Sequence, residues 1–186
     1  MRVLLDADSV SRGLRRVAGE IVERHRGVEG LVLVAVRRGG IPVADRIAYW
    51  IRELERRDIP VGSVDITLYR DDAATALPNP RIGPSDIPCA LEGARVVLVD
   101  DVLFTGRTVR AAIDALIDYG RPRRIELAVV IDRGGRELPI AADYVVRAVE
   151  VPPGERVDVI EDDDGLRAVV QPSSTPTRPP AAPRDE

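Results

Sequence analysis

Three short apolar runs constrain the fold of this chain more than any other feature. Residues 30–36 read GLVLVAV, residues 95–100 read RVVLVD and residues 123–132 read RRIELAVVID. Nearly continuous Val, Leu and Ile over so few residues is typical of strands that are buried on both faces of a parallel sheet. Because helical patterns lie between the runs, the alternation predicts an α/β domain with a mostly parallel sheet flanked by helices.

Apolar residues at helical spacing predict three helices, over residues 9–26, 41–54 and 107–119. Gly27 and Gly120 are placed to end the first and the third of them. Residues 64–69, VDITLY, alternate like a strand, and residues 70–88 read as a loop rich in Pro, Gly and Asp.

The composition suits one domain followed by a tail. A chain of 186 residues, 45% of them hydrophobic, can bury a sizeable core. From Gln171 the sequence reads QPSSTPTRPPAAPRDE and contains no large apolar residue, so this stretch cannot bury enough surface to fold. We expect a single domain over residues 1–170 and a disordered Pro-rich tail over residues 171–186. The alternative is that the tail is a Pro-rich ligand for a partner protein.

The residue types that are missing exclude several kinds of chemistry. Every basic residue is Arg, which excludes a Schiff-base lysine and the Lys of a P-loop. One Cys and one His leave no internal disulfide, no His-cluster metal site and little scope for a Ser-His-Asp triad. The formal net charge of -4 argues against a generally basic nucleic-acid-binding surface. We expect a soluble cytoplasmic protein without a membrane span, with His25 on its surface.

The stretch VVLVDDVLFTGRT, residues 96–108, contains the most informative pattern. Asp100 and Asp101 are neighbouring carboxylates that follow a buried strand, although like charges gain nothing from burial unless a ligand binds them. Residues 105–108 would start a helix, where N–H groups and hydroxyls face an anion. Carboxylates suit ribose hydroxyls and the turn suits a phosphate, so the pattern predicts a sugar 5-phosphate site at the carboxyl edge of the sheet. The alternative is that the carboxylates only cap the helix.

The same stretch resembles the phosphoribosyl-diphosphate (PRPP) motif of type I phosphoribosyltransferases. The flanking sequences IVERHRG, VDITLYRDD and TGRTVRAAIDALIDYGRPRRIELAVVIDRGGRELPI resemble the PyrR family in particular. This resemblance implies the type I phosphoribosyltransferase fold with a small hood, and transfer of phosphoribosyl from PRPP to uracil with Mg²⁺ on the diphosphate. It also implies a homo-oligomer that regulates pyrimidine biosynthesis genes by binding mRNA in response to UMP and PRPP.

The resemblance also implies roles for individual residues. Asp100 and Asp101, with Arg70 of the covering loop YRDD, would form the catalytic set. The contacts to the 5-phosphate and the pyrophosphate would be Thr105, Gly106, Arg107, Thr108, Arg37, Arg38, Gly39 and Gly40. Uracil would be received, largely by main-chain groups, at Val130, Ile131, Asp132 and Arg133. No side chain is expected to bind the metal ion directly.

The chain departs from the family pattern at three places, one of which is the covering loop after Asp72, which is shorter than usual and rich in Pro. The usual Arg of the pyrophosphate loop is Gly39 here, with Arg38 one residue earlier, and a guanidinium fork displaced by one residue often cannot substitute. Family positions that contact RNA are occupied by Gly19, Gly135 and Ala141. The candidate RNA contacts that remain are Arg15, Arg16, Arg136 and Arg147.

These departures leave three alternatives open. The chain could be a nucleotide-sensing RNA-binding regulator with little catalysis, which Gly39 favours. It could be a phosphoribosyltransferase that has lost RNA control, which Gly19, Gly135 and Ala141 favour. It could also use another base, because main-chain recognition of a base leaves little trace in a sequence.

Overall fold

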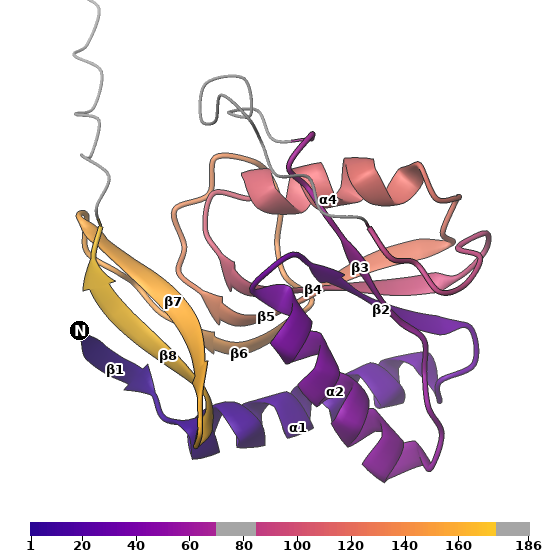
Figure 1. The fold of residues 1–186 in the computed structure, drawn as a ribbon, viewed down its shortest axis with the longest axis horizontal. Coiled ribbons are helices and arrows are strands. Elements are labelled where there is room, and N and C mark those ends of the chain that lie inside the picture. The colour runs from indigo at the N-terminus through magenta and orange to yellow at the C-terminus, as the bar shows by residue number, and fades with distance from the viewer. Residues whose placement is uncertain (70–84, 174–186) are drawn as a thin grey trace, which may run out of the picture.

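The computed structural model describes residues 1–69 and 85–173, which form two sheets and three helices (Figure 1). The helices are α1 (Ala7–His25), α2 (Gly40–Glu55) and α4 (Arg107–Ile117). The strands are β1 (Arg2–Leu5), β2 (Leu31–Val36), β3 (Val61–Val64), β4 (Arg95–Leu103), β5 (Arg124–Asp132), β6 (Tyr144–Ala148), β7 (Glu155–Asp162) and β8 (Gly165–Pro172). None of the helices in these ranges is long and apolar enough to span a membrane.

The larger sheet confirms the predicted fold class. Its strands follow the order β3-β2-β4-β5-β6, and each neighbouring pair is parallel. The three apolar runs form its three central strands, and β4 lies between the other two. Because all the strands run in one direction, their carboxyl ends share one edge of the sheet, where open α/β folds bind ligands.

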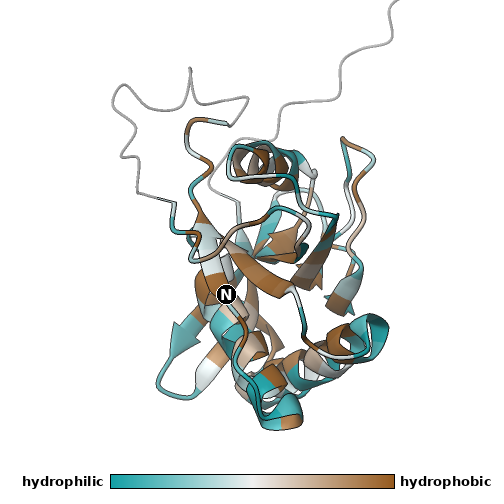
Figure 2. Ribbon diagram, turned by 90° about the vertical axis from the view of Figure 1, so that its right-hand side faces the viewer, coloured by the Kyte–Doolittle hydropathy of each residue, from teal (hydrophilic) through white to brown (hydrophobic). Residues whose placement is uncertain are grey.

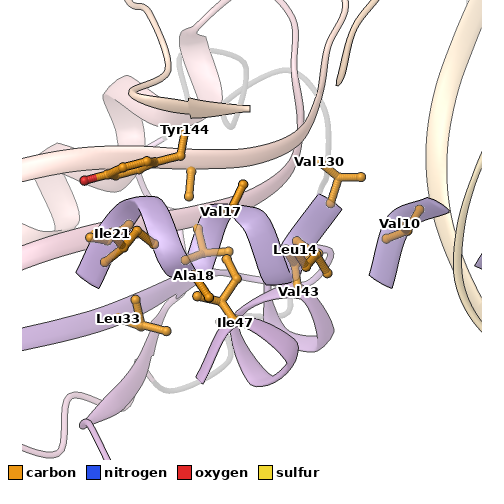
Figure 3. Close-up of a cluster of buried hydrophobic side chains, with 14 of the residues drawn as sticks. Val10, Leu14, Val17, Ala18, Ile21, Leu33, Val43, Ile47, Val130 and Tyr144 are labelled. Atoms are coloured by element: carbon orange, nitrogen blue, oxygen red, sulfur yellow. The ribbon is translucent and has the colours of Figure 1, made fainter. Parts of the chain in front are cut away.

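Successive side chains of the central strands point to opposite faces of the sheet and pack into two separate hydrophobic cores. α1 and α2 cover one face of the sheet, where Leu14 and Ile47 pack with Leu33 of β2. Figure 3 shows this cluster, in which side chains of α1 lie beside those of the sheet and of α2. α4 covers the opposite face, where Leu116 packs with Val34, the next residue of β2. Figure 2 shows the same arrangement as hydrophobic central strands between helices with hydrophilic outer sides.

The ends of α1 follow the expected capping chemistry. The Asp6 carboxylate accepts a hydrogen bond from the Ser9 N–H at 2.8 Å, which pairs one of the free N–H groups of the first turn. At the other end, Arg26 adopts the left-handed conformation and the Gly27 N–H donates to the Val22 carbonyl at 3.0 Å. The helix therefore ends at His25, one residue before the predicted end, with Arg26 in the left-handed position and Gly27 following it in the cap.

The smaller sheet, in the order β1-β8-β7, is antiparallel and forms the hood. Leu166 and Ala168 of β8 and Leu5 of β1 join the core around α1, so this helix connects the two sheets. Figure 1 shows the hood on the side toward which the arrowheads of β5 and β6 point. The hood therefore lies on the same side as the carboxyl edge of the parallel sheet.

Several element boundaries differ from the predictions, among them those of β3 and β8. β3 covers residues 61–64 and not 64–69, because Asp65 Oδ1 accepts hydrogen bonds from both the N–H (2.9 Å) and the hydroxyl (2.5 Å) of Thr67 and turns the chain. β8 continues to Pro172, and the Gln171 side chain donates to Asp158 Oδ2 on β7. The sheet thus extends two residues beyond the predicted boundary at 170, and the rest of the predicted tail, from residue 174, lies outside the described residues.

Candidate active site

Three segments that the sequence singles out meet at the carboxyl edge of the parallel sheet. β2 ends at Val36 and continues into residues 37–40, and β5 ends at Asp132 and continues into residues 133–135. β4 lies between these two strands and leads into residues 100–108. The fold therefore brings the predicted pyrophosphate loop, the carboxylate pair and the predicted base segment to one place.

Asp100 and Asp101 lie inside β4 and not at its end, because the strand continues to Leu103. Asp100 is only 5% exposed, whereas Asp101 is partly exposed. The Asp101 N–H donates to Asp100 Oδ1, and the Val102 N–H donates to Asp101 Oδ1, both at 2.9 Å. Burial, together with the neighbouring charge of Asp101, raises the pKa of the Asp100 carboxyl well above its ordinary value. A carboxylate pair that is this costly to bury is typical of a functional site.

The two helices that begin beside this pair have glycine at the N-cap position. Gly39 precedes α2 and Gly106 precedes α4, so neither helix has an N-cap side chain, and neither first turn contains an acidic residue. The α1 helix, by contrast, is capped by Asp6. Helix N-termini with unpaired N–H groups bind anions. The site is therefore suited to two anionic groups, one at the start of each helix.

Gly39 and Gly40 let α2 start directly against β4. A Cβ built on Gly39 would lie 2.5 Å from Cγ and Oδ2 of Asp101, and one built on Gly40 would lie 2.2 Å from a backbone oxygen of β4. The peptide bond between Arg37 and Arg38 is cis, Arg37 is half-buried and Arg38 is exposed. The predicted pyrophosphate loop thus lies in contact with the predicted ribose carboxylates.

The predicted phosphate turn, which runs from Thr105 to Thr108, is held by the loop that joins β5 to β6. The Thr105 carbonyl accepts hydrogen bonds from the N–H groups of Glu137 (2.9 Å) and Leu138 (3.1 Å). Arg107 Nε lies 2.6 Å from Glu137 Oε2. Because this guanidinium is paired with Glu137, we expect main-chain N–H groups and the hydroxyls of Thr105 and Thr108 to be the principal phosphate contacts.

The four residues of the predicted uracil segment differ in their exposure. Val130 and Ile131 are fully buried in the core, and their strand is paired with β4 on one side and β6 on the other. Asp132 and Arg133, at the end of the strand, are partly exposed. The end of β5, and not its buried part, is therefore the portion that a base can reach.

Phe104 lies at this edge and was not among the residues predicted from the sequence. Its ring is 44% exposed, and the Arg133 guanidinium carbon lies 4.2 Å from the ring centroid. A Cβ built on Gly135 would come within 2.4 Å of Phe104 Cε2, so the ring edge rests on the Gly135 backbone. The signal in the sequence was the placement of the only Phe of the chain inside the acidic motif.

The candidate RNA contacts fall into two groups. Arg16 donates to the carbonyls of Val145 (2.9 Å) and Val146 (3.1 Å) and pairs with Glu20, so it fastens α1 to β6. Arg136 donates to Asp132, to the Phe104 carbonyl at 2.7 Å and to the carbonyls of Gly134 and Ile140. Arg15, 5.3 Å from the Trp50 ring centroid, and Arg147 are exposed. The first two side chains therefore have structural partners, and the last two face outward.

The expectation that His25 lies on the surface is wrong. Its side chain is 5% exposed, and its Nε2 lies 2.6 Å from Oε2 of Glu126, a buried residue of β5. Tyr144 donates to the same oxygen at 2.9 Å, and Arg124 Nε lies 2.8 Å from Glu126 Oε1. Burial alone would raise the pKa of Glu126, but the hydrogen bonds from Tyr144 and His25 lower it below its ordinary value. The burial of His25 could not be predicted because its partner, Glu126, lies 101 residues away in the sequence. A local sequence pattern does not show such a contact.

The carboxylates of the site could bind Mg²⁺ only together with ligands from the substrate phosphates. Within residues 1–69 and 85–173, no group of three or more His, Cys, Asp or Glu side chains could hold a metal ion. Mg²⁺ in proteins is commonly bound by one or two carboxylates together with substrate phosphates. Asp101, partly exposed at the edge, suits that arrangement. Arg70, predicted to act in the covering loop, lies outside the described residues.

Comparison with known proteins gives a consistent result. Residues 3–160 match the family described as "Phosphoribosyl transferase domain". The chain is 52% identical over 168 residues to "Bifunctional protein PyrR" of Pelotomaculum thermopropionicum, which covers 90% of this chain and 93% of that relative. It is 55% identical over 160 residues to the protein of the same name from Geobacter sulfurreducens, covering 86% and 90%. The hypoxanthine phosphoribosyltransferase structure of Trypanosoma cruzi has a TM-score of 0.68 at 20% identity, covering 93% of this chain and 98% of that one, and so shares the fold.

Proposed function

Because the chain belongs to the phosphoribosyltransferase family and, within it, to the bifunctional PyrR proteins, we propose that it is a uracil phosphoribosyltransferase that also regulates pyrimidine biosynthesis genes. It transfers the phosphoribosyl group of PRPP to uracil and produces UMP and pyrophosphate. The observation that carries this proposal is a pair of adjacent carboxylates, with Asp100 buried, at the edge of the sheet where two helices begin with glycine at the N-cap.

The reaction breaks the bond between the anomeric carbon and a diphosphate oxygen, and forms a bond from that carbon to N1 of uracil, which loses its proton. Positive charge develops on the ribose as the diphosphate leaves. Such a displacement needs positioning and fixed negative charge more than a protein nucleophile. Asp100 and Asp101 would accept hydrogen bonds from the ribose hydroxyls and stabilise that charge, which agrees with a site that lacks Lys, Cys and His.

The phosphate groups of PRPP would lie at the two helix N-termini. The 5-phosphate suits the start of α4 at Thr105–Thr108, and the diphosphate suits the start of α2 at residues 37–40. When bound, Mg²⁺ would neutralise charge on the diphosphate, and the partly exposed Asp101 carboxylate would be the side chain that could share in holding it. Arg38 is exposed beside the Gly39 position and is the guanidinium best placed to contact the leaving group.

Uracil would lie at the end of β5, against Asp132 and Arg133. Asp132 Oδ1 accepts the Gly134 N–H at 3.0 Å, and its other oxygen is paired with Arg136, so the side chain is held in one orientation. A fixed edge of main-chain and side-chain groups can recognise the polar edge of a pyrimidine. This placement sets the base beside the ribose carboxylates of β4.

The test of catalysis is the paired substitution Asp100→Asn with Asp101→Asn. We expect UMP formation from uracil and PRPP to be lost while the circular dichroism spectrum stays that of a folded protein. The matched control replaces another pair of adjacent carboxylates, Asp163 and Asp164, in the exposed turn between β7 and β8. Wild-type kcat/KM in the Asp100–Asp101 variant would contradict the site assignment.

The protein would regulate these genes by binding the mRNA of a pyrimidine operon in response to UMP and PRPP. It would do so in the cytoplasm and as an oligomer. The exposed Arg15 and Arg147 support phosphate contacts of this kind. A second candidate function is an enzyme without RNA control, which is favoured by the engagement of Arg16 and Arg136 within the protein. A gel shift on the leader RNA of the protein's own pyrimidine operon separates the two. UMP-dependent binding supports regulation, and no shift at saturating UMP supports the second candidate.

A further inference from the structure

Phe104 is an exposed aromatic residue in a chain that has few of them. Only 3% of the residues are aromatic, and this is the single Phe. A Phe side chain normally lies in the core, yet this one is 44% exposed between the end of β4 and the start of α4. It lies three residues after Asp101 and two before Gly106, and therefore between the proposed ribose and phosphate contacts.

The ring is held in place although much of it is exposed. The Arg133 guanidinium packs on it at 4.2 Å from the centroid, and Arg133 Nη2 donates to the Glu155 carbonyl of β7 at 3.0 Å. Arg133 Nε has no hydrogen-bond partner among residues 1–69 and 85–173, so the ring and the Glu155 carbonyl determine where this guanidinium lies. Hydrogen bonding of the Phe104 carbonyl to Arg136 fixes the backbone as well, at 2.7 Å.

Gly135 completes this support. Its φ is +70°, and a Cβ there would lie 2.4 Å from Cε2 and 3.0 Å from Cδ2 of the ring. The ring edge is therefore in direct contact with the backbone of the β5–β6 loop. Any side chain at position 135 would displace the ring, so this glycine and Phe104 are matched to each other.

We propose that Phe104 is the base-positioning residue of the site, whose exposed ring surface stacks on the pyrimidine ring while Arg133 and Gly135 hold it in place. The inference rests on the proposed function, since it assigns the base of that reaction to this position. Aromatic side chains bind flat bases by stacking, and a surface that is fixed before binding loses little entropy when the base arrives. Base recognition then combines the polar end of β5 with this apolar face.

The test compares Phe104→Leu, Phe104→Tyr and wild-type protein. Leu keeps apolar bulk but cannot stack, so we expect KM for uracil and Kd for UMP to rise roughly 10-fold or more. KM for PRPP should stay within about twofold, because the phosphate and ribose contacts are untouched. Tyr should restore wild-type values. The control is Tyr119→Leu, which removes an aromatic ring of similar exposure (46%) beyond the end of α4.

Calorimetric binding of UMP keeps this inference separate from the proposed activity. A wild-type protein that makes UMP, with unchanged uracil KM and UMP affinity in Phe104→Leu, overturns the stacking role and leaves the enzyme assignment standing. A wild-type protein that makes no UMP but binds it, with weaker binding in Phe104→Leu, overturns the catalysis and supports the stacking role. Failure of the wild type both to make and to bind UMP overturns both. If Phe104→Leu does not fold, Gly135→Ala displaces the ring instead and should raise the same two constants.

Discussion

The backbone of Gly39 lies against the carboxylate of Asp101, so that a Cβ on Gly39 would be 2.5 Å from Cγ and Oδ2. Position 39, at which the family resemblance implies an Arg, is thus in contact with a proposed ribose ligand. In this chain the contact sets the distance between the pyrophosphate loop and β4. The glycine at position 39 therefore affects the position of the Asp101 carboxylate as well as the contacts to the diphosphate.

Gly39→Ala should impair PRPP use because the Asp101 side chain has to move. A displacement of about 1 Å in a positioning group can lower kcat/KM roughly 100-fold, and we expect a loss of that order, mostly in KM for PRPP. The matched control is Gly19→Ala on α1, where an added Cβ meets nothing within 4 Å. Steady-state kinetics with PRPP varied provide the measurement. Equal kinetic constants in the two variants would show that the contact between Gly39 and Asp101 does not affect PRPP use.

Asp100→Asn should stabilise the free protein at neutral pH while lowering kcat/KM roughly 100-fold through weaker charge stabilisation. Burial and the charge of Asp101 raise the pKa of Asp100 in the folded state, so ionising it opposes folding. This cost develops as the pH rises above the unfolded value of about 3.9, and the amide removes it. We expect Tm to rise by several degrees at pH 7, on the order of 1 kcal/mol, and the gain to vanish near pH 3. A variant less stable than wild type at pH 7 contradicts this interpretation.

Tyr144→Phe should weaken the acid dependence of stability. The hydrogen bond from Tyr144 lowers the pKa of Glu126, so the network stabilises the fold above the unfolded pKa of about 4.3 and is lost as the pH falls through the lower folded value. Removing the hydroxyl should cost about 1–3 kcal/mol at pH 7, because the buried Glu126 Oε2 loses one of its two hydrogen-bond partners and keeps only His25. Urea unfolding from pH 7 to pH 3 measures both effects, with the exposed Tyr119→Phe as control. An acid dependence identical to that of wild type would argue against the network.

Arg136→Met should impair the enzyme and not RNA binding alone. The guanidinium holds Asp132 and the carbonyls of Phe104 and Ile140, so its loss frees the loop that covers the phosphate turn. We expect a higher KM for uracil and a loss of stability of about 2 kcal/mol, since several hydrogen bonds are broken, two of them part-buried. Thermal unfolding and uracil kinetics measure this, with the exposed Arg123→Met as control. A change confined to RNA affinity would contradict the structural role.

The fold could be predicted from the sequence because its main signals are local. The runs at residues 30–36, 95–100 and 123–132 are apolar along both strand faces, and the structure places them at the centre of a parallel sheet. β1, β7 and β8 gave weaker signals, because strands of an antiparallel sheet with one exposed face lack the continuous apolar run of a strand that is buried on both faces. The turn at Asp65 also escaped prediction, since β3 ends where the Asp65 carboxylate accepts two hydrogen bonds from Thr67.

The sequence by itself determined the chemistry of the site: a carboxylate pair, a Thr-Gly-Arg-Thr turn and glycines where helices begin, all within short segments whose residue types already state what they can bind. Only the tertiary structure decided what these groups contact. It placed Gly39 on Asp101, Arg107 on Glu137, Phe104 on Arg133 and His25 on Glu126. These pairs are separated by 29 to 101 residues, and contacts at such separations depend on strand order and packing, which local periodicity does not specify.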